Sequence, residues 1–156
     1  MENKKISIVL DVIIIGFLIL LISGTVIAWS KLPSEIPNHI DSMGRIEDYM
    51  TKNFLFFPVC IGIILGGGIL LLSKYPKLYN YPVEITEENR EKQYFSATIM
   101  MKALSIEVLL IFTYMNYCII MVKNCSEGML ILVVMIFFTL LCYWRSSIKN
   151  KWVQII

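Results

Sequence analysis

Four long apolar runs constrain this chain more than any other feature of its sequence. They cover residues 12–29, 54–73, 103–122 and 128–144, and Glu107 is the one charged residue within them. A helix needs about 20 apolar residues to cross the hydrocarbon core of a bilayer. Backbone groups without hydrogen-bond partners cannot face lipid. Each run is therefore predicted to be a transmembrane helix, even where β-branched residues would favour a strand in water.

The composition is typical of a polytopic membrane protein. Of the 156 residues, 57% are hydrophobic and 17% are charged, and the charges gather between the apolar runs. The predicted fold is all-α, a four-helix transmembrane bundle. It forms a single membrane domain over residues 1–156, and the lipid bilayer is its expected surroundings and partner. The expected spans are residues 6–29, 54–73, 99–122 and 128–144, with an outer loop at 30–53 and a cytoplasmic loop at 74–98.

The first run has a second interpretation, as a cleaved signal peptide. Lys4 and Lys5 precede it, and Val26–Ala28 resembles a weak cleavage site. The apolar region of a signal peptide has about 7 to 15 residues. Because this run is longer, we expect it to be retained as an anchor.

The basic residues predict the orientation, because Lys and Arg are enriched in cytoplasmic flanks. Ten of them lie on the side of the two termini and four on the other side. The first group is Lys4, Lys5, Lys74, Lys77, Arg90, Lys92, Lys102, Arg145, Lys149 and Lys151, and the second is Lys31, Arg45, Lys52 and Lys123. Both termini are therefore expected in the cytoplasm.

The outer loop, residues 30–53, is patterned rather than slack. Pro33 and Pro37 favour an extended entry, and Gly44 permits a tight turn. After that turn, Ile46, Tyr49 and Met50 have helical spacing. This spacing predicts a short helix over residues 45–52, lying on the membrane surface.

The same loop carries a family resemblance. Leu32-Pro33, Ile36-Pro37, His39, Gly44 and Lys52 resemble the LP-x-x-IP-x-H…G…K signature of the domain-of-unknown-function 1648 family. That family is similar to the amino-terminal part of SdpI-type bacterial immunity proteins. The resemblance implies a protein of the bacterial cytoplasmic membrane with a role in immunity or in peptide-responsive signalling.

His39 has two interpretations. As a functional group, an exposed imidazole near Asp41 would sense pH or hold the carboxylate of a ligand, because histidine titrates near neutrality. As a structural group, it would bond loop carbonyls and maintain the turn. The neighbouring proline and glycine residues favour the structural role.

Asp11 and Glu107 are ionisable groups within apolar segments, where a carboxylate is costly unless shielded. With both termini inside, each is expected roughly 6 to 8 Å above the cytoplasmic boundary, at 1.5 Å per residue. If they are neighbours, one holds a proton, or the pair binds a cation or faces Lys102 and Lys5. Alternatively, both reach interfacial water and are merely tolerated.

Gly62 and Gly66 form a G-x-x-x-G pattern in the second span, which lets another helix approach closely. Packing within the bundle is favoured over homodimerisation, and the oligomeric state stays open. In the cytoplasmic loop, Thr86 is a suitable N-cap, so the third helix is expected to begin near it, outside the membrane.

Several function classes find no support in the sequence. It has no H-E-x-x-H or G-x-S-x-G motif and no basic block typical of nucleic-acid binding. Its only histidine, His39, has no cysteine nearby, so we expect no metal site, no cofactor and no enzymatic activity.

Two hypotheses remain. The first is a non-enzymatic membrane protein whose outer loop recognises an extracellular peptide or another membrane protein, with Pro33, Pro37, His39, Gly44, Arg45 and Lys52 as candidate site residues. The second is a small transporter or accessory subunit that uses Asp11 and Glu107, for which Thr113, Asn116 and Thr139 are the few other polar groups within the spans.

Overall fold

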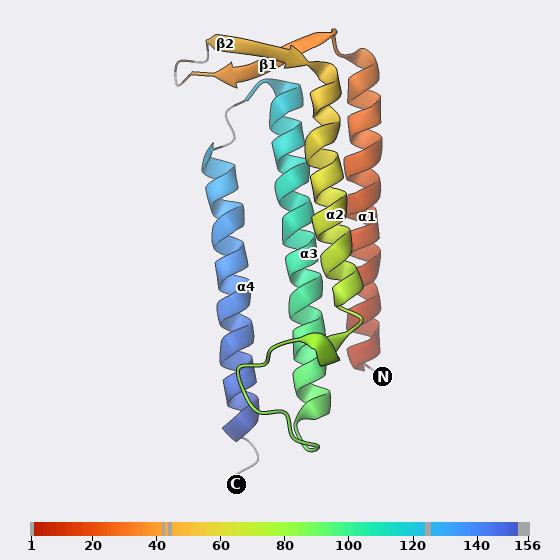
Figure 1. The fold of residues 1–156 in the computed structure, drawn as a ribbon, viewed down its shortest axis with the longest axis vertical. Helices are drawn as coiled ribbons and strands as arrows, with labels where there is room; N and C mark the ends of the chain where they lie inside the picture. Colours follow the sequence, from red (N-terminus) through yellow and green to blue (C-terminus); the bar gives the residue numbers. More distant parts are fainter. Residues whose placement is uncertain (1, 42, 44, 124–125, 153–156) are drawn as a thin grey trace.

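The computed structural model describes residues 2–41, 43, 45–123 and 126–152. Its helices are α1 (Glu2–Lys31), α2 (Phe56–Leu72), α3 (Arg90–Met121) and α4 (Ser126–Trp152). All four are long and apolar enough to cross a membrane, as predicted. They alternate in direction, so both ends of the chain lie at one end of the molecule (Figure 1), here called the terminal end.

The prediction of an all-α fold is wrong in one place. Residues Glu35–Ile40 form strand β1, which pairs antiparallel with strand β2, Ile46–Thr51. The expected surface helix at 45–52 is therefore a strand, followed by a short 3-10 helix at Lys52–Leu55. The spacing of Ile46 and Met50 also fits one face of a strand, and pairing with β1 selects the strand. We call the opposite pole of the molecule, where this hairpin lies, the hairpin end.

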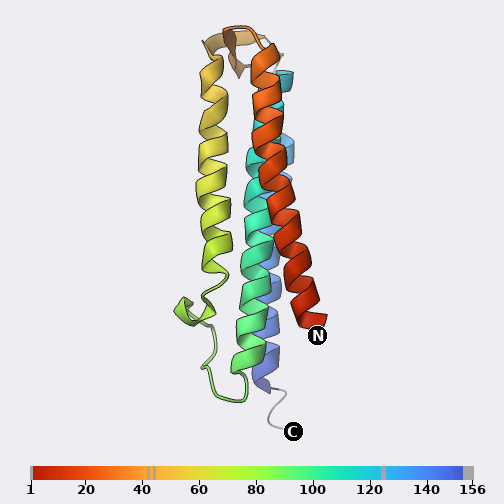
Figure 2. The same cartoon turned by 90° about the vertical axis from the view of Figure 1, so that its right-hand side faces the viewer.

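The helices do not form a square bundle, since α3 contacts each of the others and α4 packs chiefly against α3. The buried core of Ile14, Leu21, Val59 and Leu109 lies among α1, α2 and α3. Figure 2 shows α1 and α2 on either side of α3, with α4 behind it. The fourth helix thus flanks a three-helix core.

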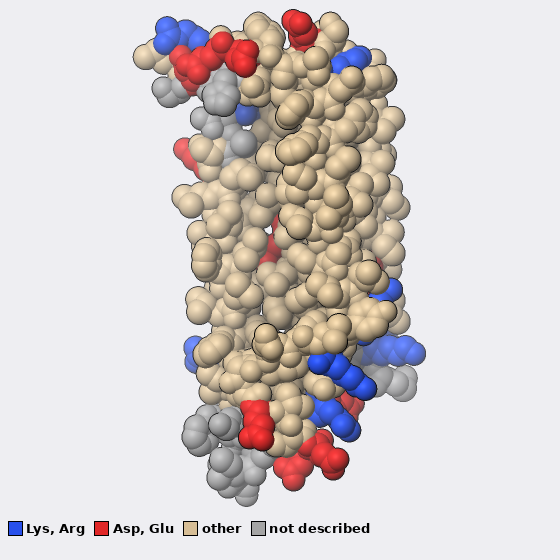
Figure 3. All heavy atoms as spheres, in the orientation of Figure 1, with Lys and Arg blue, Asp and Glu red and all other residues tan. Residues whose placement is uncertain are grey.

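Most of the helical surface is apolar and unpacked. Large aliphatic and aromatic side chains are exposed all along α1 and α4, and most charged side chains gather at the two ends of the molecule (Figure 3). A helix that is hydrophobic all round belongs in lipid or in a large core. This surface fits a bilayer.

The helices differ in length. At 1.5 Å per residue, the 30 residues of α1 and the 32 of α3 exceed a hydrocarbon core of about 30 Å. Before α3 begins, Thr86 and Asn89 exchange hydrogen bonds, with the Thr86 amide donating to Asn89 Oδ1 at 3.0 Å and the Asn89 amide to Thr86 Oγ1 at 3.3 Å. Thr86 therefore helps to start the helix, which begins four residues later at Arg90.

Candidate functional site

Helix α3 carries a series of polar side chains that bond the other three helices. We call this set the polar series of α3: it comprises Gln93, Thr98, Lys102, Ser105, Glu107 and Asn116. All but Thr98 are buried. Polar groups inside a membrane are costly and are usually paired or functional, so the partners of each member matter.

Towards α1, Lys102 makes an ion pair. Its ammonium lies 2.7 Å from Asp11 Oδ1 and donates to the Ser7 hydroxyl at 2.7 Å and to the Ser7 carbonyl at 3.0 Å. The Lys102 side chain is 6% exposed and that of Asp11 is 37% exposed. The lysine is thus buried with its charge compensated, while the carboxylate keeps access to the surface.

Nearer the hairpin end, Asn116 also faces α1. Its amide donates to Thr25 Oγ1 at 2.5 Å, and that hydroxyl donates in turn to the Leu21 carbonyl at 2.6 Å. Both Asn116 and Thr25 line a cavity of about 440 Å³ between α1 and α3. The contact links the two helices at a second level, well away from the ion pair.

Towards α2, close packing accompanies the hydrogen bonds. Ser105 donates to the Gly66 carbonyl at 2.8 Å. A Cβ atom at Gly66 would lie 2.7 Å from Leu109, and one at Gly62 would lie 3.0 Å from Phe112. The two glycines of the G-x-x-x-G pattern therefore sit against α3, where their missing side chains let the two backbones approach.

Towards α4, the contacts are fewer. Gln93 Nε2 donates to the Ser147 carbonyl at 3.0 Å, and the Thr139 hydroxyl donates to Glu107 Oε1 at 2.5 Å. Glu107 is 6% exposed, and its second oxygen, Oε2, has no hydrogen-bond partner among the described residues. This carboxyl group is thus nearly buried with a single donor.

The structure does not bring Asp11 and Glu107 together. Asp11 of α1 faces Lys102 of α3, whereas Glu107 of α3 faces Thr139 of α4. Along α3, Thr98 bonds Ser73, the residue after α2 ends, and Glu107 lies nine residues further on, which corresponds to about 13 Å. Asp11 is level with Lys102.

A heptad spacing relates the members of the polar series, and the sequence interpretation missed it. Lys102 and Asn116 face α1, Thr98 and Ser105 face α2, and Gln93 and Glu107 face α4. Each pair is separated by seven or fourteen residues, and such spacing returns to the same face of a packed helix. Searching the third span together with the ten residues before it for polar residues at multiples of seven would have found all three pairs.

At the hairpin end, Lys52 ties α1 to the hairpin. Its ammonium donates to the carbonyls of Trp29 at 3.2 Å and Leu32 at 3.1 Å and lies 4.3 Å from the centroid of the Trp29 ring. A cation at a helix C-terminus compensates the unpaired carbonyls and the helix dipole. Trp29 Nε1 also donates to Asn53 Oδ1 at 3.1 Å, so the hairpin is fastened at its base.

The tip of the hairpin is organised by Asp41. One carboxylate oxygen accepts the amides of Met43 and Arg45, both at 2.8 Å, and the other lies 2.7 Å from Arg45 Nε. The hydrogen bonds from Arg45, its backbone amide first, lower the pKa of Asp41 below its usual range. Arg45, a candidate ligand-binding residue in the sequence, is engaged by this neighbour.

The other candidate loop residues have structural positions in or before β1. Pro33 precedes the strand, Pro37 lies within it opposite Tyr49, and the backbone of His39 lies opposite Asp48. The side chain of His39 and the whole of Gly44 lie outside the described residues, so the structure does not test their proposed roles.

At the terminal end, tyrosines hold the connection between α2 and α3. The Tyr79 hydroxyl donates to the Leu72 carbonyl at 2.6 Å, the Tyr81 hydroxyl donates to the Pro76 carbonyl at 2.8 Å, and the Tyr81 ring stacks on Tyr94 of α3. Burial, with a smaller contribution from Tyr143, raises the pKa of Tyr79 and of Tyr81. These tyrosines fasten the loop and stay neutral.

Four helices long and apolar enough to span a membrane, three of them packed around the polar α3, indicate a multi-pass membrane protein with a small hairpin at one end. Among the described residues, no group of three or more potential ligands is placed to hold a metal ion. Residues 15–63 match the model of the DUF1648 family, whose description is a domain of unknown function. This match runs from α1 through the hairpin into α2 and confirms the family resemblance. No curated protein and no solved structure matches the chain.

Proposed function

We propose that this chain is a non-enzymatic protein of the bacterial cytoplasmic membrane whose hairpin recognises an extracellular peptide. The outcome of recognition would be immunity against that peptide or a response to envelope stress. The resemblance of the loop motif to SdpI-type immunity proteins supports the proposal, and so does the position of the hairpin at one pole of the molecule.

The orientation is part of the proposal. The hairpin and the described ends of the chain lie at opposite poles (Figure 1). If the membrane side of one pole is known, the side of the other follows. Lys and Arg are concentrated at the terminal end, ten against four, which favours that end in the cytoplasm. The hairpin would then face the outside.

The observation that carries the proposal is the outer edge of β2, which no other strand of the sheet covers. The sheet has two strands, so the outer edge of each strand has no neighbouring strand within the sheet. The outer edge of β1 contains Pro37, which has no amide to donate, whereas β2, Ile46–Thr51, contains no proline. An extended peptide can add as a third strand to such an edge.

The side chains on this edge are suited to a basic, partly apolar peptide. Glu47 and Asp48 are exposed, and so is Tyr49, at 56%. Arg45 is compensated by Asp41, which leaves the strand with acidic character. The attachment of the hairpin through Lys52 provides a fixed base, so little ordering is required on binding.

The test blocks the edge without dissolving the hairpin. The Lys52 amide bonds the Ser34 carbonyl, so by the alternation of an antiparallel ladder the Tyr49 amide points away from β1. This amide donates to Asp48 Oδ1 at 2.8 Å, and an added strand would take the place of that carboxylate. Tyr49→Pro removes that donor, and Tyr49→Ala removes the same side chain but keeps the amide. Cells expressing each form are challenged with a panel of membrane-active peptides.

We expect the native protein to protect cells from at least one basic peptide of the panel. Tyr49→Pro should lose that protection and Tyr49→Ala should keep most of it. Protection by Tyr49→Pro equal to that of the native chain would refute recognition at the edge. A panel in which the native protein never protects would refute immunity.

A second candidate function is supported by the buried carboxyl of Glu107. In a small transporter or accessory subunit, Asp11 and Glu107 would take part in coupling, and their neutralisation would abolish activity while hairpin changes would not. Loss of protection in Tyr49→Pro together with full protection in Glu107→Gln would decide for peptide recognition.

A further inference from the structure

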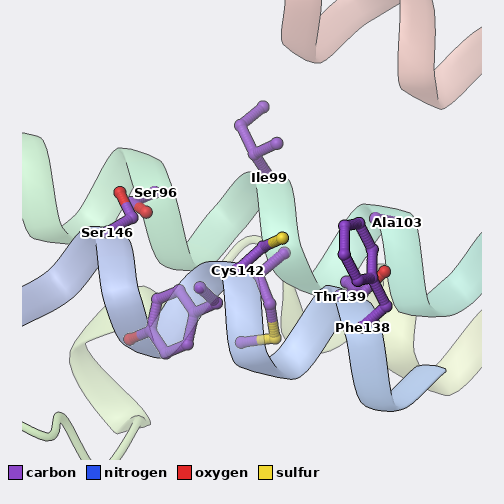
Figure 4. Close-up of a pocket in the computed structure, with 9 residues that line it drawn as sticks. Ser96, Ile99, Ala103, Phe138, Thr139, Cys142 and Ser146 are labelled. Carbon is purple, nitrogen blue, oxygen red and sulfur yellow. The ribbon is translucent and has the colours of Figure 1, made fainter. Parts of the chain in front are cut away.

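A groove of about 270 Å³ separates part of α3 from α4. Figure 4 shows Ser96 and Ser146 together at one end of it, Ala103 and Thr139 at the other, and Cys142 between them. The two serines are nearer the terminal end of the molecule. A water molecule occupies about 30 Å³ of liquid, so the groove has room for several, with hydroxyl groups at both ends to bond them.

The inner end of the groove reaches the carboxyl of Glu107 through Thr139. Thr139 lines the groove, and its hydroxyl is the one donor to that carboxyl among the described residues. Acidic atoms are visible between α3 and α4 about halfway along the molecule (Figure 3). The groove therefore connects the terminal end with a buried acid near the middle of the membrane.

The surroundings of Glu107 suit a neutral carboxyl group. An ionised carboxylate has about four acceptor positions, and here one donor reaches Oε1 while Oε2 has no partner among the described residues. Burying a charged carboxylate without compensating donors is costly. One carboxyl and one hydroxyl are also too few oxygens for Ca²⁺ or Mg²⁺.

Among the described residues, no neighbouring ionisable group supplies a positive charge that would compensate an ionised Glu107. From α4, Cys142 and Tyr143 line the groove. Helix α2 has no charged residue between Phe56 and Leu72. Asp11 of α1 and Lys102 of α3 are paired with each other on another face.

On the side of the hairpin end, the lining of the groove stops at Ala103 of α3 and Phe138 of α4. Helix α4 is uninterruptedly apolar from Leu130 to Phe138, so no polar side chain continues the route on that helix beyond Thr139. A proton that enters from the terminal end therefore leaves by the same end.

We propose that Glu107 and Thr139 form a proton-binding site in the middle of the membrane, which exchanges protons with water at the terminal end through the groove between α3 and α4. Uptake and release on one side make it a sensor rather than a through-going conduit. The site lies on the contact that holds α4, a helix that packs chiefly against α3. Loss of the proton leaves a charge in that contact, so the packing of α4 depends on pH at the terminal end.

The first experiment detects the proton directly. Infrared difference spectra of the full chain in liposomes are recorded as a function of pH, following the carbonyl stretch of protonated carboxyl groups. A titrating band should be present in the native chain and in Asp11→Asn, and absent in Glu107→Gln. Because the Thr139 hydroxyl bonds Glu107 Oε1, Thr139→Val should change the midpoint of this band, whereas Thr139→Ser should not.

The second experiment tests the groove as the route. In a chain whose other cysteines are replaced, Cys142 is exposed to a charged, membrane-impermeant thiol reagent from the terminal end. Leu141→Cys in a background lacking Cys142 is the matched control, since Leu141 is the adjacent residue, has nearly the same depth and is 66% exposed on the outer surface of α4. Thiols react as thiolates, which require water, so Cys142 should react much faster than the control.

Either of two results would overturn the proposal. One is the absence of any carboxyl band assigned to Glu107 across the pH range in which the protein stays folded. The other is equal reactivity of Cys142 and the Leu141→Cys control. Neither result depends on peptide recognition, so this proposal and the function of the hairpin fail separately.

Discussion

The two sides of α3 solve the same electrostatic problem in different ways. On the side of α1, the carboxylate of Asp11 is matched by the Lys102 ammonium at 2.7 Å, and Ser7 completes the contact. On the side of α4, the Thr139 hydroxyl is the one donor to Glu107 among the described residues. The first carboxylate is matched by a cation, whereas the second is matched by a neutral donor. The first contact is therefore an ion pair, and the second is the one that we propose as a proton site.

The largest expected effect comes from breaking the ion pair. Asp11→Asn leaves Lys102, whose side chain is 6% exposed, without its counter-charge. Removing one partner of a buried pair costs about 3 kcal/mol or more, so the free energy of unfolding in mixed micelles should fall by about that amount. Glu107→Gln, the matching neutralisation on the other side, should leave it nearly unchanged at neutral pH. Equal losses of unfolding free energy in Asp11→Asn and Glu107→Gln would show that the two sides of α3 do not differ in this way.

Replacing both members of the pair is the control. In Asp11→Asn combined with Lys102→Met, no buried charge is left uncompensated, and exchanging a buried pair for neutral groups is often close to neutral in stability. The double variant should therefore be more stable than Asp11→Asn alone. A double variant less stable than the single one would mean that Lys102 acts through packing.

The next effect concerns how tightly α2 packs on α3. Gly66→Ala puts a methyl group 2.7 Å from Leu109, and overpacking of this kind costs about 1–3 kcal/mol. Gly67→Ala is the control on the same helix, since nothing lies within 4 Å of its added Cβ. Only the first variant should unfold more readily, and similar stabilities would show that the helices separate without cost.

A smaller effect is expected at the contact with α4. Thr139→Val removes the donor to Glu107 while keeping the shape of the side chain, and interhelical hydrogen bonds in membranes contribute about 0.6 kcal/mol on average. The free energy of unfolding at neutral pH should fall by no more than that. A loss as large as that of Asp11→Asn would mean that Glu107 is ionised and depends on this hydroxyl.

The smallest effect is expected for a third carboxylate, which lies in water. The pKa of Asp41 is lowered from its ordinary value of 3.8, so its bonds to Arg45 stabilise the hairpin tip fully above that pH. The stabilisation is lost as the pH falls through the lower, folded pKa. The amide resonance of Arg45 should shift at that pH, and Asp41→Asn should remove the shift. A midpoint above 3.8 would contradict the observed hydrogen bonds.

The sequence predicts the elements that the bilayer itself imposes. Length and apolarity determine the four spans, because lipid leaves the backbone few alternatives. The hairpin was missed because the spacing of Ile46 and Met50 fits one face of a helix as well as one face of a strand, and only pairing with β1 decides between them. The Leu-Pro and Ile-Pro signature nevertheless located the loop that the family model covers.

The candidate site was harder to predict than the fold. Both intramembrane carboxylates were identified, but their partners depend on how α1 and α4 are rotated against α3, which apolar surfaces do not determine. The contact between α3 and the end of α2 at Thr98 and Ser73 also lies before Ala103, where the apolar run begins, so the run alone does not show where the two helices start to pack.

The polar series of α3 also has a consequence for how the chain enters the membrane. With a lysine, a glutamate and an asparagine in its spanning part, α3 is the least apolar of the four spans, and isolated polar residues oppose partitioning into lipid. Its partners for Lys102 and Ser105 belong to α1 and α2, which are synthesised first. We therefore expect α3 to leave the insertion machinery together with these two helices, and α4 to follow as the last segment added to a completed core.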